Sequence, residues 1–129
     1  MVTSRALNTI VLSLVIVGNS VAGTAAVSDN GIRTLGSSLA YIAHCEKESH
    51  IAPGTSADFM LVMQSTLTTD SWLSIKNEYQ KSLHDKKQYS VAKKQWIPFQ
   101  INGENCTDLY EAIPIMKATL RKWAEATAN

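Results

Sequence analysis

Several sequence signatures of catalysis are missing from this chain of 129 residues. It contains no Cys-x-x-Cys pair, no glycine-rich phosphate loop and no Gly-x-Ser-x-Gly motif. The common patterns of thiol redox centres, nucleotide-binding loops and serine hydrolases are therefore excluded. The two cysteines and three histidines match no metal-binding spacing. We predict no cofactor, no metal site and no catalytic residue, and we favour a non-enzymatic protein over an enzyme.

The chain also lacks a surplus of one charge sign. Lys and Arg number 12 and Asp and Glu number 11, which gives a formal net charge of +1. A nearly neutral protein has no global field that attracts polyanions or anionic membranes. We therefore expect no nucleic-acid partner, and we expect a protein partner instead.

A long apolar run is missing as well. The N-terminal run at residues 6–17 has about a dozen residues, whereas a membrane-spanning helix needs about 20. Arg5 precedes it and small residues follow it, which is the pattern of a cleavable signal peptide. We predict that residues 1–26 are this peptide, that the protein is exported to a bacterial periplasm, and that no stable membrane anchor remains after cleavage. Secretion to the medium and an uncleaved N-terminal anchor are the alternatives.

The sequence leaves several cleavage points open between residues 22 and 26. Ser20-Val21-Ala22 fits a small-x-small pattern, and cleavage could follow Ala22, Gly23, Ala25 or Ala26.

Residues 27–129 are long enough for one domain with a modest core. Loss of Arg5 takes the basic residues from 12 to 11 against 11 acidic residues, so this domain is neutral. It contains Cys45 and Cys106, and two lone cysteines pair with each other in an oxidising compartment. Their disulfide would close a loop of about 60 residues and stabilise the fold by about 4 kcal/mol. A redox or metal pair is the alternative.

Apolar residues at helical spacing predict an all-α class, a small single-domain bundle of three to five helices. Asp29 or Asn30 would cap a first helix that ends near residue 46, and a second helix would cover about residues 56–67. A third helix follows a cap at residues 68–70, and we expect it to extend through Val91, the alternative being a break near Gln88.

The last part of the chain contains Pro98 and Pro114, which limit the secondary structure that can form around them. We expect an extended loop near residues 96–104, because a single short strand there would have no partner. Asn105 or Thr107 would cap the last helical region. Pro114 has no amide hydrogen, so it predicts either a short turn followed by a helix or a kink.

Lysines and aromatic residues gather in one segment and form the candidate partner surface. Its members are Lys76, Lys81, Lys86, Lys87, Lys93, Lys94, Tyr89 and Trp96. Such a group could contact an acidic protein, a polyanionic glycan or lipid headgroups, and a solvated helix face is the alternative. We expect Trp72, Trp96 and Trp123 to be core anchors, and an exposed tryptophan beside Pro98 and Phe99 would mark an interface.

An unrecognised enzyme site near His44 is the competing functional hypothesis. It would use His44 with Glu46 or Glu48 as an acid-base pair. We favour solvated surface histidines and a binding protein of the cell envelope; the oligomeric state is not predicted. A secreted factor that contacts a host or a competitor is a further alternative.

Overall fold

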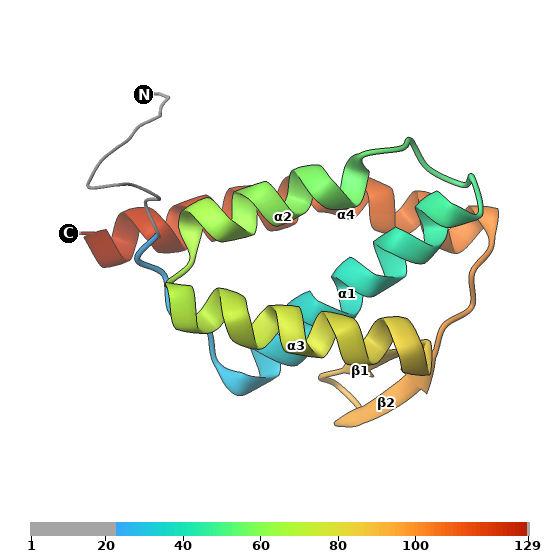
Figure 1. Cartoon of the computed structure of the whole chain (residues 1–129), viewed down its shortest axis with the longest axis horizontal. Coiled ribbons are helices and arrows are strands. Elements are labelled where there is room, and N and C mark those ends of the chain that lie inside the picture. The colour runs from blue at the N-terminus through green and yellow to red at the C-terminus, as the bar shows by residue number, and fades with distance from the viewer. Residues whose placement is uncertain (1–22, 129) are drawn as a thin grey trace.

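The computed structural model describes residues 23–128, which form four helices and one two-stranded antiparallel sheet (Figure 1). The elements are α1 (Asp29–Lys47), α2 (Thr55–Thr66), α3 (Thr69–Asp85), β1 (Lys87–Ser90), β2 (Gln95–Pro98) and α4 (Gly103–Ala128). The predicted signal peptide lies mostly outside the described residues, since these begin at Gly23. The mostly helical class is confirmed, although the small sheet means that the fold is not a pure helix bundle.

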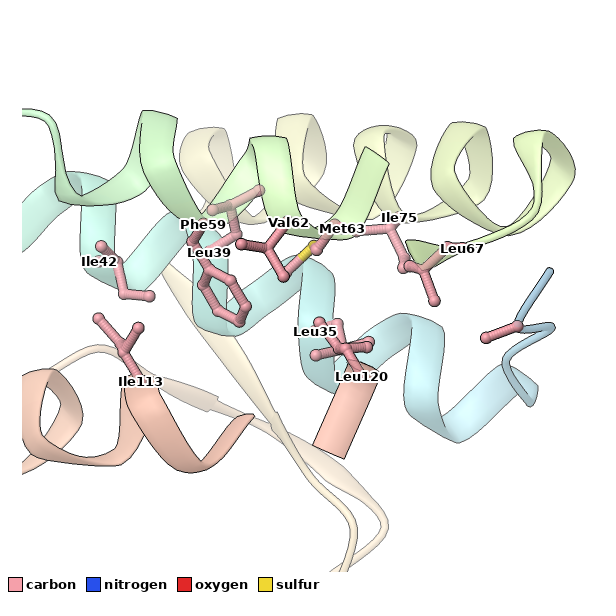
Figure 2. Packing of buried hydrophobic residues seen from close by; sticks show 11 residues of the cluster. Leu35, Leu39, Ile42, Phe59, Val62, Met63, Leu67, Ile75, Ile113 and Leu120 are labelled. Carbon is pink, nitrogen blue, oxygen red and sulfur yellow. The ribbon is translucent and has the colours of Figure 1, made fainter. Parts of the chain in front are cut away.

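Helix α1 is central, because it contacts the other three helices and β1. Its residues Leu35, Leu39 and Ile42 recur at helical spacing and are buried. Figure 2 shows Ile42 facing Ile113 of α4, and Leu35 lying beside Leu120. The apolar stripe predicted for the first helix is therefore the centre of the core.

The remaining core side chains come from α2, α3 and α4 and from the segments just before α1 and just after α2. They are Ala25, Phe59, Val62, Met63, Leu67, Ile75, Ile113 and Leu120, all at most 9% exposed. Trp123 was expected to be a core anchor but is 43% exposed. It lies in the last turns of α4, beyond Leu120, where the described core ends.

Gly36 sets the distance between α1 and α3. A Cβ atom at this position would lie 2.6 Å from the Glu78 Cβ and 3.0 Å from the Ile75 carbonyl oxygen. Only glycine lets the two helix backbones approach this closely.

Side chains in the connecting segments define where the helices begin. Ser28, rather than Asp29 or Asn30, caps α1, since its hydroxyl accepts a hydrogen bond from the Gly31 amide. Thr68 caps α3 by accepting from the Ser71 amide, as the sequence predicts.

The predicted disulfide is confirmed: Cys45, near the end of α1, is bonded to Cys106, in the first turn of α4. The bond spans a sequence separation of 61 residues. Both cysteines and Tyr41 are buried, and Phe99 and Ile101 pack against them. A second, smaller apolar cluster thus forms at the disulfide end of the molecule.

The predicted extension of the third helix through Val91 is wrong. Helix α3 ends at Asp85, and Lys86 adopts a left-handed conformation with φ 56° that turns the chain into β1. The predicted loop near residues 96–104 is wrong at both ends, because residues 96–98 belong to β2 and residues 103–104 belong to α4. Each strand supplies the partner that the other lacks when its segment is considered alone.

Packing on α1 overrides the helical preference of this segment. The Ser37 hydroxyl accepts a hydrogen bond from the Tyr89 amide at 3.0 Å, which ties β1 to α1. At the base of the hairpin, the Phe99 amide donates to the Lys86 carbonyl at 2.8 Å. A helix through this segment could make neither contact.

The predicted turn before Pro114 is also absent, since α4 continues from Gly103 to Ala128 with Pro114 inside it. Pro114 is exposed, so the carbonyl that loses its helical donor faces the solvent side.

Asn102, rather than Asn105 or Thr107, caps the helix: its side-chain oxygen accepts from the Asn105 amide at 2.8 Å. Among the described residues, no helix is long and apolar enough to cross a membrane.

Candidate binding surface

The lysine hairpin, which we define as residues 86–99, places most of the predicted surface on one element (Figure 1). In the sheet register, Lys87 pairs with Pro98 and Tyr89 pairs with Trp96. Because cross-strand partners lie on the same face of a sheet, Lys87, Tyr89 and Trp96 share one face. The sheet therefore brings together residues that are up to nine positions apart in sequence.

Aromatic contacts support this face. The rings of Tyr89 and Trp96 meet edge to face with centroids 5.3 Å apart. The guanidinium of Arg33, on α1, lies 5.5 Å from the Tyr89 ring centroid, within the range of a cation–π contact. Trp96 is 37% exposed, so it is not the core anchor that we expected. It stands two residues before Pro98, the place where the sequence predicts that an exposed tryptophan would mark an interface.

The hairpin carries four exposed lysines, Lys86, Lys87, Lys93 and Lys94. The last two belong to the turn, in which Lys94 has a left-handed φ of 53° and its amide donates to the Val91 carbonyl at 3.3 Å. In the described part of the chain, no ion pair joins these four lysines to an acidic side chain. Their positive charge is thus directed at solvent.

Lys81 joins the hairpin lysines, but Lys76 does not. A cavity of about 260 Å³ between α3 and the hairpin is lined by Lys81, Ser82, Asp85, Lys87 and Trp96. The Lys81 ammonium lies 3.6 Å from a Glu78 carboxylate oxygen. Lys76 instead has its ammonium 5.9 Å from the Trp72 ring centroid, more than one helical turn before Lys81. The structure therefore divides the predicted set.

Ser82 Oγ, from a residue that lines this cavity, is buried without a hydrogen-bond partner among the described residues, and so is Glu78 Oε1, four residues earlier on α3. Leaving a buried polar atom unpaired costs about 1–3 kcal/mol. The α3 face beneath the hairpin is consequently a place where polar groups are not fully satisfied by the fold.

An apolar groove lies beside the hairpin turn. Its volume is about 260 Å³, and its walls come from α1, the turn and α4, with Leu35, Val91, Ile115 and Leu120 among the lining residues. Ile115 is 69% exposed and Val91 is 49% exposed. The sequence analysis missed this groove because its walls come from three separate segments. The only sequence signal was Ile115, which falls outside the apolar stripe of its helix.

His44 does not form the acid-base pair of the competing hypothesis. Its ring is half-buried, with Nε2 3.3 Å from the Leu83 carbonyl oxygen and the Phe99 ring centroid 5.5 Å away. The expectation of a solvated His44 is therefore wrong, since it packs under the base of the hairpin. Within residues 23–128, no group of three or more His, Cys, Asp and Glu side chains could hold a metal ion.

Glu46 has a structural task. Its carboxylate oxygens accept hydrogen bonds from the Gly54 amide at 2.7 Å and the Ser56 amide at 2.8 Å, at the start of α2. Gly54 occupies the N-cap position and has no side chain for this role. Burial raises the pKa of Glu46, but hydrogen bonds from Ser56, Gly54 and Thr55 outweigh that effect and lower it. The Glu46 charge in turn raises the pKa of Tyr79, after the larger effect of burial.

Ser90 and Lys93 have a Ser-x-x-Lys spacing that the sequence analysis passed over. Such a spacing places a nucleophile and a base on a helix in some hydrolases. Here the Ser90 hydroxyl accepts a hydrogen bond from the Lys93 amide at 3.2 Å, inside an exposed hairpin turn. The pair therefore shapes the turn.

No protein-family model matches this chain, and searches of curated proteins and of solved structures find no significant match.

Proposed function

We propose that this chain is a small exported protein of the bacterial cell envelope that binds another protein through the lysine hairpin and does not act as an enzyme. The single observation that carries the proposal is the exposed hairpin, in which Lys87 shares a face with the Tyr89 and Trp96 rings while Lys86, Lys93 and Lys94 are exposed at the two ends of the strands. A cationic patch on a neutral domain attracts an acidic partner and fixes its orientation.

The neighbouring groove favours a protein over a polyanionic glycan or a lipid headgroup. Protein interfaces combine an apolar centre with a polar or charged rim, and aromatic and Arg side chains supply much of their binding energy. Val91 and Ile115 supply an apolar centre, and Lys93 and Lys94 lie two and three residues after Val91 in the chain. The partner segment we expect is therefore acidic and carries at least one apolar anchor.

Two features support the periplasm as the compartment. The N-terminal 26 residues have the signal-peptide pattern, and a disulfide persists in oxidising compartments such as the periplasm. We extend the proposal to the domain boundary: one folded domain follows a peptide that is removed on export.

Charge reversal tests the binding face. A tagged full-length chain with Lys86→Glu, Lys87→Glu, Lys93→Glu and Lys94→Glu is exported in its native host, and partners are captured from the envelope after crosslinking. We expect the amount of acidic partner captured to fall about tenfold or more, because like charges now face each other across the interface. Lys47→Glu, Arg121→Glu and Lys122→Glu, all exposed outside the hairpin, serve as the control and should leave capture intact.

The groove is tested by a matched pair of exposed apolar residues. Ile115→Ser alters the groove, whereas Leu61→Ser alters α2 outside it; the two side chains are 69% and 65% exposed. We expect only Ile115→Ser to weaken capture. Unchanged capture by the lysine variant would contradict the proposed surface, and recovery of all mature protein from the medium would contradict the periplasmic location.

A further inference from the structure

The residues just before α1 belong to the folded domain. Ala25 is 0% exposed and forms a parallel bridge with Leu67, in the connection between α2 and α3. Its amide donates to the Thr66 carbonyl at 3.1 Å, and its carbonyl accepts from the Thr68 amide at 2.9 Å. These two bonds tie the end of α2 and the start of α3 to the N-terminal segment.

The neighbours of Ala25 are fitted to the same place. Gly23 lies so close to Thr66 that a Cβ atom would overlap the Thr66 backbone, so only glycine fits there. Thr24 donates from its hydroxyl to the Ala124 carbonyl at 3.0 Å, which reaches α4. Val27 donates its amide to the Ser71 hydroxyl at 3.0 Å. Residues 23–27 therefore contact α2, α3 and α4.

We infer that the leader is cleaved between Ala22 and Gly23, so that the mature chain begins at Gly23. This inference rests on the proposed export, because only an exported chain is processed in this way. The enzyme class is a signal peptidase, which hydrolyses the Ala22–Gly23 peptide bond with one water molecule to leave a carboxylate on Ala22 and an amine on Gly23.

The contacts of Gly23 and Ala25 distinguish between cleavage points that the sequence alone leaves open. Gly23-Thr24-Ala25 and Thr24-Ala25-Ala26 are also small-x-small, as is Ser20-Val21-Ala22. Cleavage after Ala25 or Ala26 would remove the bridge to Leu67 and leave the Thr68 amide without its acceptor. Cleavage after Gly23 would place the branched Val21 three residues before the cut, and it would discard the glycine that fits against Thr66.

The direct test is the N-terminus of the exported protein. Full-length chain is expressed with its own leader, the periplasmic fraction is isolated, and intact mass and N-terminal sequencing are measured. We expect a single species that begins with Gly23. A species that begins with Thr24, Ala26 or Val27 would overturn the inference but leave export standing. A chain that still begins at Met1 would contradict the export proposal itself.

Three substitutions in the full-length precursor give a second, independent readout. Ala22→Leu should abolish the Gly23 product, because a large residue then precedes the cut. Ala25→Leu should be processed normally and lower the Tm of the mature protein by about 5–10 °C, because Ala25 is fully buried. Ala26→Leu, at the exposed neighbour, is the matched control and should change neither the cleavage position nor the Tm.

The rival cleavage points predict a different pattern. If the enzyme cut after Ala26, Ala26→Leu would block processing, and Ala25→Leu would leave the Tm of the mature protein unchanged because Ala25 would be gone. Either result would overturn the assignment.

Discussion

The helical core and the lysine hairpin meet along α1, but they are built from opposite kinds of side chain. Leu39, Phe59 and Ile75 of the core are 0% exposed and come from three different helices. In the hairpin, Lys86, Lys87 and the whole turn are exposed. A two-stranded sheet is at best marginally stable alone, so the hairpin depends on the contacts that it makes with α1 and with the disulfide cluster.

The difference suggests a division of tasks within about 100 residues. Substitutions in the core should alter the free energy of unfolding of the whole domain, whereas charge reversal of hairpin lysines to Glu should alter binding and leave stability within about 0.5 kcal/mol. The following predictions test this division, from the largest expected effect on stability to the smallest.

Phe59→Ala should destabilise the domain by about 3–5 kcal/mol, because it removes a fully buried aromatic ring between α1 and α2. Urea unfolding followed by circular dichroism measures the loss. Leu61→Ala, at an exposed site on the same helix, is the control and should cost less than about 0.5 kcal/mol. Hydrogen exchange at the Tyr89 amide should accelerate in parallel with exchange in α2. Continued protection of Tyr89 in an unfolded core would show that the hairpin is independent.

Replacing both disulfide cysteines, Cys45→Ala with Cys106→Ala, should cost about 4 kcal/mol, since the unfolded chain regains the freedom of a long loop. The rate of hydrogen exchange should increase more at the hairpin amides than at the Met63 amide in α2, because Phe99 of the hairpin packs on the cluster around the disulfide. Reduction of the unsubstituted protein is the control and should reproduce the loss. Equal acceleration at both places would mean that the cluster does not support the hairpin separately.

Glu46→Gln should cost about 1 kcal/mol at neutral pH, because the amide offers one acceptor where the carboxylate offers two and carries no charge at the start of α2. Glu48→Gln, at an exposed position, should have little effect.

The same residue predicts a pH dependence. Folding lowers the pKa of Glu46 below its value of 4.5 in the unfolded chain. The contribution of Glu46 to the free energy of unfolding is therefore complete at pH values above the unfolded pKa, and it is lost as the pH falls through the lower pKa of the folded protein. Urea midpoints should therefore converge between the unsubstituted protein and Glu46→Gln below about pH 4.5. A difference that persists undiminished into stronger acid would contradict the assigned role.

Lys86→Gly should raise stability by about 0.5–1 kcal/mol, because Lys86 ends α3 in a left-handed conformation that glycine adopts without strain. Lys87→Gly, in the extended backbone of β1, removes the same charge and should instead cost about 0.5–1 kcal/mol. Thermal unfolding distinguishes the two signs. If both variants lost stability, the free energy lost with the contacts of the Lys86 side chain would exceed the free energy gained by relieving its left-handed backbone.

Local signals predicted the presence of the helices and the disulfide, although not the caps of α1 and α4 or the end of α3. The apolar stripe of α1, the Thr68 cap and the pairing of Cys45 with Cys106 each depend on a few nearby residues or on elimination. The hairpin could not be predicted in this way. Its strands are four residues each, Lys86 gives no glycine signal where the helix ends, and the contact that selects β1 comes from Ser37 on a distant helix.

The binding surface was predicted in composition but not in arrangement. The lysines and Trp96 were identified from their proximity in sequence, yet placing Lys87, Tyr89 and Trp96 on one face required the strand register. The groove beside Ile115 depends on three segments meeting in space, and Pro114 left α4 unbroken because it lies on the exposed side. Tertiary packing, rather than local preference, determined each of these outcomes.

The disulfide has a consequence for proteolysis. The turn at Lys93 and Lys94 is exposed and lies between Cys45 and Cys106 in the chain, so a trypsin-like cut there severs the backbone inside a covalently closed loop. The two fragments remain joined, with Leu39 and Phe59 on one piece and Ile113 and Leu120 on the other, still able to share one core. A nicked molecule would run as a single species until it is reduced.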